Sequence, residues 1–147
     1  MKIISGGQTG ADQGGLEAGK ELGLETGGWA PYGWKTEDGP NKPLLEAYGL
    51  KMCLKEGYPA RTRKNVEDSD LTVLFGRMDS PGSKLTSKLC IALDKHFAVN
   101  PLPNMLRTLI KKYDVDVLNV AGNRESRSPG LQTYVRRTLV EALRWNI

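Results

Sequence analysis

The chain has 147 residues, a length typical of one domain with a single hydrophobic core. Hydrophobic residues make up 39% of the sequence, and the 17 glycines bring the apolar share to about half, which excludes disordered and fibrous classes. No apolar run approaches the roughly 18 residues that span a bilayer. In Met1–Gly7, glycines follow the first apolar residues too soon to leave the apolar core of a signal peptide. We therefore expect a cytoplasmic protein.

The cysteine and histidine content argues against zinc sites and disulfides. The chain holds two cysteines, Cys53 and Cys90, without a CxxC pair, and one histidine, His96, so a zinc site of ordinary spacing cannot be built and a disulfide framework is not expected. The net charge is +4, but residues 1–60 carry 6 basic and 8 acidic side chains, while residues 61–147 carry 15 and 9. These charges of −2 and +6 admit an anionic ligand or a nucleic acid as a partner, or simply a solvated basic surface.

Short apolar runs alternate with stretches of helical periodicity along the chain. The first half predicts a strand at 2–5, a glycine-rich turn at 6–12, a helix from there to Leu22, a short strand at 26–29 and a long loop at 30–43. The second half predicts a helix at 61–68, a strand at 71–75, a loop at 76–82, a helix at 83–95, a strand at 96–100, a helix at 104–113, a strand at 115–120, and a last helix from Ser128 and Pro129 to about Trp145. We therefore expect a single α/β domain over residues 1–147, with a three-layer, Rossmann-like, doubly wound fold. Its mainly parallel sheet of about five strands carries helices on both faces.

Ligands of such sheets bind beyond the carboxyl ends of the strands, where the connections diverge. The first loop at such an end is Ser5–Asp12, whose glycines permit a tight turn and whose following helix offers free N–H groups to an anion. This pattern predicts a phosphate cradle, although it is neither GxGxxG nor a P-loop. The alternative is a tight strand-to-helix connection with Thr9 or Asp12 as the helix cap.

A second loop, Gly28–Pro40, combines aromatic rings with hydroxyl, amine and carboxylate groups, Asp38 among them. Such a mixture suits a flat heterocycle and its sugar, with Trp29 or Trp34 stacking on the base. The alternative is that the tryptophans only pin the loop to the domain.

A third element is the basic run that precedes the strand at 71–75. Its guanidinium groups suit the bidentate binding of phosphate or molybdate oxygens. At helical spacing Arg61 and Asn65 share a face, whereas Arg63 points elsewhere, so one of the two arginines is expected to be only solvated.

Two more loops follow predicted strands. The small-residue turn Ser80–Thr86 starts a helix and supplies N–H groups and hydroxyls to an anion, or only places Ser83 as an N-cap. The polar loop Asn119–Gly130 leaves the last strand, and its neighbours Arg124 and Glu125 either form an internal ion pair or offer a cation and a base to the ligand.

Five loop motifs, read in order, resemble the putative molybdenum carrier family over nearly the whole chain: ISGGQTGAD at 4–12, GGWAPYG at 27–33, TEDGP at 36–40, RTRKNV at 61–66 and LNVAGNRES at 118–126. That family belongs to a Rossmann-like superfamily related to the lysine-decarboxylase-like phosphoribohydrolases and to the DNA-processing protein DprA. The resemblance implies a nucleotide or a molybdenum cofactor, as molybdopterin or molybdate, at the glycine-rich loops. It also implies a homo-oligomer.

The resemblance places the ligand-binding residues in three groups. Gly7, Gln8, Thr9, Gly10 and Asp12 form the first ligand loop, Arg61, Arg63 and Asn65 face the crevice, and Asn119, Gly122, Arg124, Glu125 and Ser126 close it. The turn at 80–86 adds Gly82, Ser83 and Thr86. In the related phosphoribohydrolases a PGGxGTxxE pattern holds a catalytic glutamate, and alignment on Gly82 and Ser83 puts Thr86 at that position. This departure disfavours an enzyme of that type, because cleavage of an N-glycosidic bond needs a carboxylate.

Three functions remain after this comparison of motifs. The first is a binding or carrier protein for a phosphate-bearing nucleotide or the molybdenum cofactor. The second is a nucleotide hydrolase in which Asp12 or Glu125 is the base, with Asp38 as a further candidate carboxylate. The third, less favoured, is the binding of single-stranded nucleic acid by the basic second half.

Overall fold

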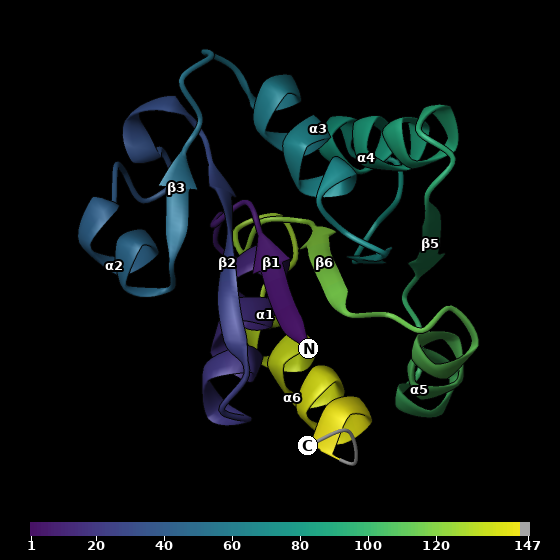
Figure 1. Ribbon diagram of the computed structural model, residues 1–147. Helices are drawn as coiled ribbons and strands as arrows, with labels where there is room; N and C mark the ends of the chain where they lie inside the picture. The colour runs from purple at the N-terminus through teal and green to yellow at the C-terminus, as the bar shows by residue number, and fades with distance from the viewer. Residues whose placement is uncertain (145–147) are drawn as a thin grey trace.

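A computed structural model describes residues 1–144 of the chain. Its centre is a parallel six-stranded sheet of order β3-β2-β1-β6-β4-β5, which confirms the doubly wound α/β prediction (Figure 1). The strands are β1 (Lys2–Ser5), β2 (Glu25–Ala30), β3 (Leu50–Met52), β4 (Leu71–Phe75), β5 (His96–Val99) and β6 (Val117–Gly122).

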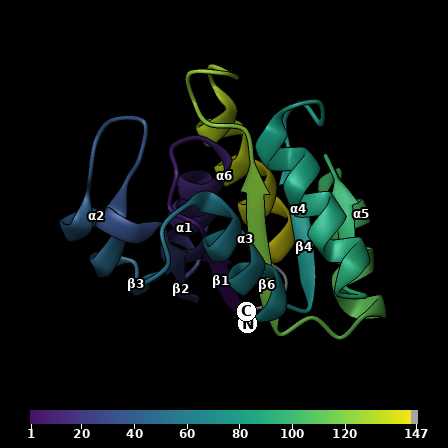
Figure 2. The ribbon, with the colours of Figure 1, turned by 90° about the horizontal axis from the view of Figure 1, so that it is seen from above.

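The helices form a layer on each face of the sheet, and helices α3 and α4 lie together on the upper face in Figure 1. Helices α1, α5 and α6 share the core on the opposite face, and α1 and α6 lie behind the strands in the view from above (Figure 2). The helical elements are α1 (Ala11–Glu21), the short 3-10 turn η1 (Tyr32–Trp34), α2 (Lys42–Ala47), α3 (Tyr58–Glu67), α4 (Pro81–Ala92), α5 (Pro103–Lys112) and α6 (Leu131–Leu143). No helix among residues 1–144 combines the length and the apolar character that a membrane crossing requires.

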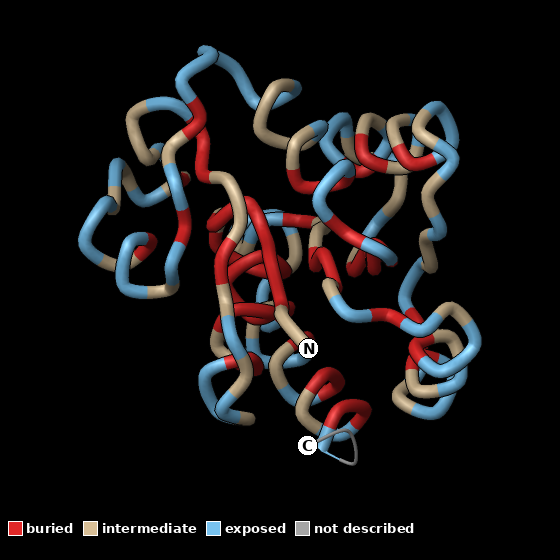
Figure 3. The backbone as a smooth tube through the Cα atoms, in the orientation of Figure 1, coloured by how far each residue is buried: buried red, intermediate tan, exposed pale blue. Residues whose placement is uncertain are grey.

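The two faces of the sheet differ in polarity. Alternate residues of the central strands, such as Val73 and Val120, belong to the main hydrophobic core with residues of α1, α5 and α6. These strands are buried along most of their length (Figure 3). Thr72 and Asn119, one position along, are also buried, and Asn119 Nδ2 donates to Thr72 Oγ1 at 3.2 Å. The face under α3 and α4 is therefore partly polar.

One strand and one helix lie outside the sequence-based prediction. The sheet has six strands rather than about five. The sequence does not predict β3, because this strand has only 3 residues, one of them lysine, and pairs only with β2 at the sheet edge. The segment expected as a loop up to residue 43 contains η1 and the start of α2, where Asn41 Oδ1 accepts the N–H of Leu44.

The start of the last helix also differs from the prediction. Helix α6 begins at Leu131 after a left-handed Gly130, not at Ser128 and Pro129. The Ser128 hydroxyl instead donates to Asn123 Oδ1 at 2.9 Å. The expected end at Trp145 lies outside the described residues.

The connections diverge at the carboxyl ends of β1, β6 and β4, which are neighbours in the sheet. Strand β1 leads into α1 on one face, whereas β4 leads into α4 on the other face, with β6 between them. A doubly wound sheet opens a crevice at such a divergence.

Candidate functional site

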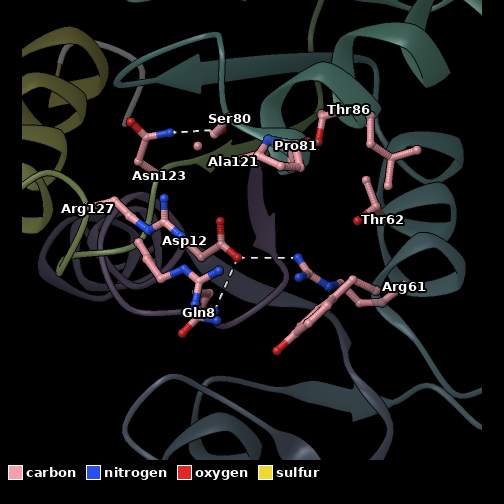
Figure 4. A pocket seen from close by; sticks show the side chains of 15 residues that line it. Gln8, Asp12, Arg61, Thr62, Ser80, Pro81, Thr86, Ala121, Asn123 and Arg127 are labelled. Atoms are coloured by element: carbon pink, nitrogen blue, oxygen red, sulfur yellow. Dashed lines mark hydrogen bonds and ion pairs between the residues drawn. The ribbon is translucent and has the colours of Figure 1, made fainter.

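A cavity of about 330 Å³ lies at this divergence, at the lower end of the range for small-molecule sites. Its walls come from four segments: Gln8 and Asp12 after β1, residues 58–62 of α3, residues 80–86 at the start of α4, and residues 121–127 at the end of β6 and in the loop that follows (Figure 4). Segments distant in the sequence thus meet here because parallel strands all end at the same edge of the sheet.

Asp12 is the one carboxylate among the residues that line the cavity. Its Oδ2 atom accepts the Gln8 N–H at 3.1 Å and lies 3.4 Å from Arg61 Nη1, as the dashed lines in Figure 4 mark. Burial raises the pKa of Asp12 from 3.8 to about 6, although Arg61 and the backbone N–H groups of Gln8 and Gly6 act to lower it. The side chain can therefore exchange a proton near neutral pH.

The glycine-rich loop keeps its N–H groups for contacts inside the protein. Gly7 donates to Ser5 Oγ, Gln8 to Asp12, and Thr9 to Gln8 Oε1. Gly10 donates to Gln132 Oε1 at 2.8 Å. The loop therefore differs from the expected phosphate cradle: its N–H groups are already bonded, and the carboxylate of Asp12 takes the place of an anion beside Gln8.

Three arginines surround the cavity. Arg61 projects from α3, its side chain 14% exposed, and its buried Nε has no partner within residues 1–144. Its guanidinium also lies 5.3 Å from the ring centre of Tyr58. Arg124 and Arg127 are exposed and form no ion pair with the described residues. With one carboxylate opposite, the cavity has an excess of positive charge.

The remainder of the cavity is a groove between α3 and α4. Its residues come from α3 (Tyr58 and Thr62), from α4 (Leu85 and Thr86) and from the end of β6 (Ala121). The Thr86 hydroxyl donates to Gly82 O at 2.9 Å, which leaves its oxygen able to accept. One aromatic ring, aliphatic carbons and two hydroxyls make this end suited to a flat polar ring.

Asn123 joins the start of α4 to the loop after β6. Its Oδ1 accepts the Arg77 N–H at 2.6 Å, and its Nδ2 donates to Arg77 O at 3.0 Å and to Ser80 Oγ at 3.2 Å. The Ser80 hydroxyl also caps α4 by accepting the Ser83 N–H at 3.2 Å. Ser80, not Ser83, is therefore the N-cap, and this network fixes the wall that α4 contributes.

The structure brings together only part of the set of residues predicted from the sequence. The predicted residues that line the cavity are Gln8, Asp12, Arg61, Gly82, Thr86, Gly122 and Arg124. The predicted residues that lie outside its lining are Gly7, Thr9, Gly10, Trp29, Asp38, Arg63, Asn65, Ser83, Asn119, Glu125 and Ser126.

Several of these outlying residues have clear structural partners. Asn65 accepts the Trp29 N–H at 2.8 Å and donates to Trp29 O at 3.1 Å, so this pair fastens β2 to α3. The Trp29 indole donates to Asp68 at 2.9 Å under the Lys64 ammonium and does not reach the cavity. Arg63 pairs with Glu67 one turn along its helix, at 2.8 Å.

Glu125 has both carboxylate oxygens occupied. They accept the N–H groups of Gly130 at 2.7 Å and Gln132 at 2.9 Å, so Glu125 caps the start of α6. Asp38 is exposed at the loop tip and does not line the cavity. Neither carboxylate is positioned as a base in the cavity.

Among the lining residues, Tyr58 alone lies outside the segments that the sequence singles out. Other lining residues, such as Thr62, Ser80, Asn123 and Arg127, lie within those segments but were not predicted as site residues. Glu37, which ties the loops beside the cavity, was not predicted either. No local pattern distinguishes Glu37 from its exposed neighbour Asp38. Among residues 1–144, no group of three or more His, Cys, Asp or Glu side chains is arranged to hold a metal ion.

Comparisons with known proteins agree with the resemblance drawn from the loop motifs. The crystal structure of a putative molybdenum carrier protein from Syntrophus aciditrophicus SB, at 1.45 Å resolution, is 31% identical, with a TM-score of 0.82. The match covers 96% of this chain and 92% of that one. No curated protein matches the chain. The profile of the circularly permutated YpsA SLOG family matches residues 3–143, nearly the entire length, and the chain therefore belongs to that family.

Proposed function

We propose that the chain binds a small phosphate-bearing ligand, a nucleotide or a pterin such as the molybdenum cofactor, in the cavity at the ends of β1, β4 and β6. The observation that carries this proposal is the excess of cationic groups: Arg61, Arg124 and Arg127 line the cavity against the single carboxylate of Asp12. Arginine is the side chain best matched to phosphate and other oxyanions, because its planar fork can donate two parallel hydrogen bonds.

Arg61 has hydrogen-bonding capacity to spare. A guanidinium carries five N–H donors, and within residues 1–144 this one donates only to Asp12, over a long 3.4 Å. A buried donor without a partner is costly, and a ligand oxygen beside Nε would remove that cost. The N–H of Gly82, in the first turn of α4, forms no hydrogen bond with the described residues and supplies a further donor at a helix start.

The groove between α3 and α4 favours a ligand with a ring over a bare oxyanion. Tyr58, Leu85 and the hydroxyls of Thr62 and Thr86 provide an apolar surface with polar edges. The structural relative from Syntrophus is named a putative molybdenum carrier protein, which supports the inclusion of molybdopterin among the ligands to test.

Calorimetric titration tests this function. We expect adenosine monophosphate or molybdopterin to bind, and adenosine, which lacks the phosphate, to bind at least about tenfold more weakly, since charged hydrogen bonds contribute about 1.5–3 kcal/mol each. Molybdate alone would occupy only the arginine end and should bind more weakly than molybdopterin. Equal affinity for adenosine and its monophosphate would contradict the proposal, and tight, salt-sensitive binding of a single-stranded oligonucleotide would favour the nucleic-acid alternative.

A second candidate function is hydrolysis of a nucleotide, with Asp12 as the general base. The observation that favours it is a buried carboxyl group in the cavity with a pKa of about 6, a value matched to acid–base work near neutral pH. Glu125, the other candidate base, is engaged at the start of α6.

Incubation of the protein with adenosine monophosphate, followed by chromatography for free base and ribose phosphate, tests this candidate. A base acts as the carboxylate, so the rate should rise as the pH increases through about 6, and Asp12→Asn should abolish it. The same variant should still bind the nucleotide, because it keeps the shape of the side chain and removes a negative charge. Intact nucleotide after prolonged incubation would leave binding as the function.

A further inference from the structure

Glu37 lies outside the cavity but joins the loops that form it. Its carboxylate accepts hydrogen bonds from the Thr9 hydroxyl, in the loop after β1, and from the Ser126 hydroxyl, in the loop after β6. The backbone N–H of Ser126 also donates to it, at 3.1 Å. One side chain from the β2–β3 connection thus contacts both of the other connections.

The backbone of Glu37 adds a direct link to the cavity. Its N–H donates to Gln8 Oε1 at 2.8 Å, and the same oxygen accepts the Thr9 N–H at 3.1 Å. Thr9 Oγ1 accepts the Glu125 N–H at 3.2 Å, next to Arg124. Gln8 and Arg124 both line the cavity, so the Glu37 contacts restrain one lining residue from each side.

The pKa and the hydrogen bonds of Glu37 indicate an ionised carboxylate that is held in place by its neighbours. Desolvation acts to raise its pKa, but hydrogen bonds from Ser126 and Thr9 and the charge of Arg124 outweigh this, so the pKa lies below its usual value. The group is therefore ionised at neutral pH, and both oxygens are occupied by donors of the chain itself. Such a carboxylate is suited to holding loops rather than to moving a proton.

We propose that Glu37 is a positioning residue, which fastens the loops after β1 and β6 to each other so that Gln8 and Arg124 face the anionic group of the ligand. This inference rests on the proposed binding function and adds to it a residue whose side chain does not touch the ligand. It also gives the β2–β3 connection a role that its sequence does not reveal.

Replacement of Glu37 by glutamine tests the proposal. The variant loses the charge and one of the acceptors, and we expect its affinity for adenosine monophosphate or molybdopterin to fall about tenfold, the cost of roughly one charged hydrogen bond. Amide hydrogen exchange should become faster in residues 6–10 and 123–127 and stay unchanged in the central strands. Glu46→Gln is the matched control, because Glu46 is exposed on α2 and its carboxylate has no partner within residues 1–144.

Variants of Thr9 separate positioning from general stability. Thr9→Ser keeps the hydroxyl and should retain affinity, whereas Thr9→Val keeps the volume, loses the hydroxyl and should bind as weakly as Glu37→Gln. The proposal is overturned if Glu37→Gln binds as tightly as the wild type, or if exchange accelerates throughout the chain. Should the wild type bind neither ligand, the proposed function fails, and local exchange in the two loops still decides the role of Glu37.

Discussion

Replacement of Arg61 by alanine is expected to lower ligand affinity by about two orders of magnitude, the effect typical of a central arginine anchor. Arg61 is the one cavity arginine that is largely buried, and its guanidinium has donors left for a ligand. Calorimetric titration of adenosine monophosphate or molybdopterin measures the loss. Arg63→Ala is the matched control, since Arg63 lies on the same helix and pairs with Glu67 at the surface. Equal effects of the two variants would contradict the assignment of Arg61 to the ligand.

The same variant should lose stability in a pH-dependent way. Without Arg61 the buried carboxylate of Asp12 has no counter-ion, which costs about 3 kcal/mol or more when the group is charged. The pKa of Asp12 is already raised to about 6, and loss of Arg61 would raise it further, so its contribution to stability is present at low pH and is lost as the pH rises through the pKa. Urea unfolding should therefore show a larger deficit for Arg61→Ala at pH 8 than at pH 5.

A second substitution separates the two roles of Arg61. Asp12→Asn in the Arg61→Ala background removes the unpaired charge and should restore most of the stability at pH 8, but not the affinity. Recovery of both would mean that Arg61 acts on the ligand only through the fold.

The sequence predicted the fold well because the signals for it are local. Buried strands such as Leu71–Phe75 are continuous apolar runs, and helices such as α5 show apolar residues at helical spacing. The one strand that it missed, Leu50–Met52, is stabilised by pairing with β2 rather than by its own pattern. Its existence depends on a contact between distant segments, which propensity does not encode.

The candidate site was predicted less completely, for a related reason. Loops at the carboxyl ends of parallel strands must lie together, so the general place followed from the fold. Which side chains face the cavity depends on tertiary contacts. Helical spacing separates Arg61 from Arg63, as the structure shows. Asn65 lies on the face of Arg61, but its side chain is hydrogen-bonded to the backbone of Trp29 and does not line the cavity. Glu37 depends on partners 28 and 89 residues away in the chain.

The glycine-rich loop is a turn, as the sequence predicts, but its N–H groups do not form the open phosphate cradle that the sequence also suggests. Gly10 passes close to the backbone of Asn123 and Glu125, whereas Gly6 and Gly7 pack against side chains. The N–H groups of the loop are bonded to Ser5, Asp12, Gln8 and Gln132. Positive charge for an anion comes instead from arginines on α3 and on the loop after β6. The loop therefore shapes the site, and the arginines provide most of its attraction.

Replacement of Gly10 by alanine is expected to destabilise the fold strongly, because two costs combine at this position. Gly10 has a φ angle of +80° and a ψ angle of −127°, a combination outside the left-handed helical region that costs an L-residue about 1–3 kcal/mol. A Cβ atom would also lie 2.4 Å from Asn123 O and 2.7 Å from Glu125 N, which are backbone atoms that cannot rotate away. Relief of this overlap, at a further cost of about 1–3 kcal/mol, would push the loops after β1 and β6 apart.

Gly23 provides a control with a positive φ angle and no close neighbour. Its φ angle is +71°, close to that of Gly10, but a Cβ atom there would have no neighbour within 4 Å. We therefore expect Gly23→Ala to lower the free energy of unfolding by about 1 kcal/mol and to leave ligand affinity unchanged. Urea unfolding of both variants measures the difference, and Gly10→Ala should also lose affinity if the variant folds. If Gly10→Ala and Gly23→Ala lowered the free energy of unfolding equally, the close contact at Gly10 would carry no cost and the prediction would be wrong. A larger loss at Gly10, together with a loss of affinity, would support the close contact of the two loops as the reason for glycine there.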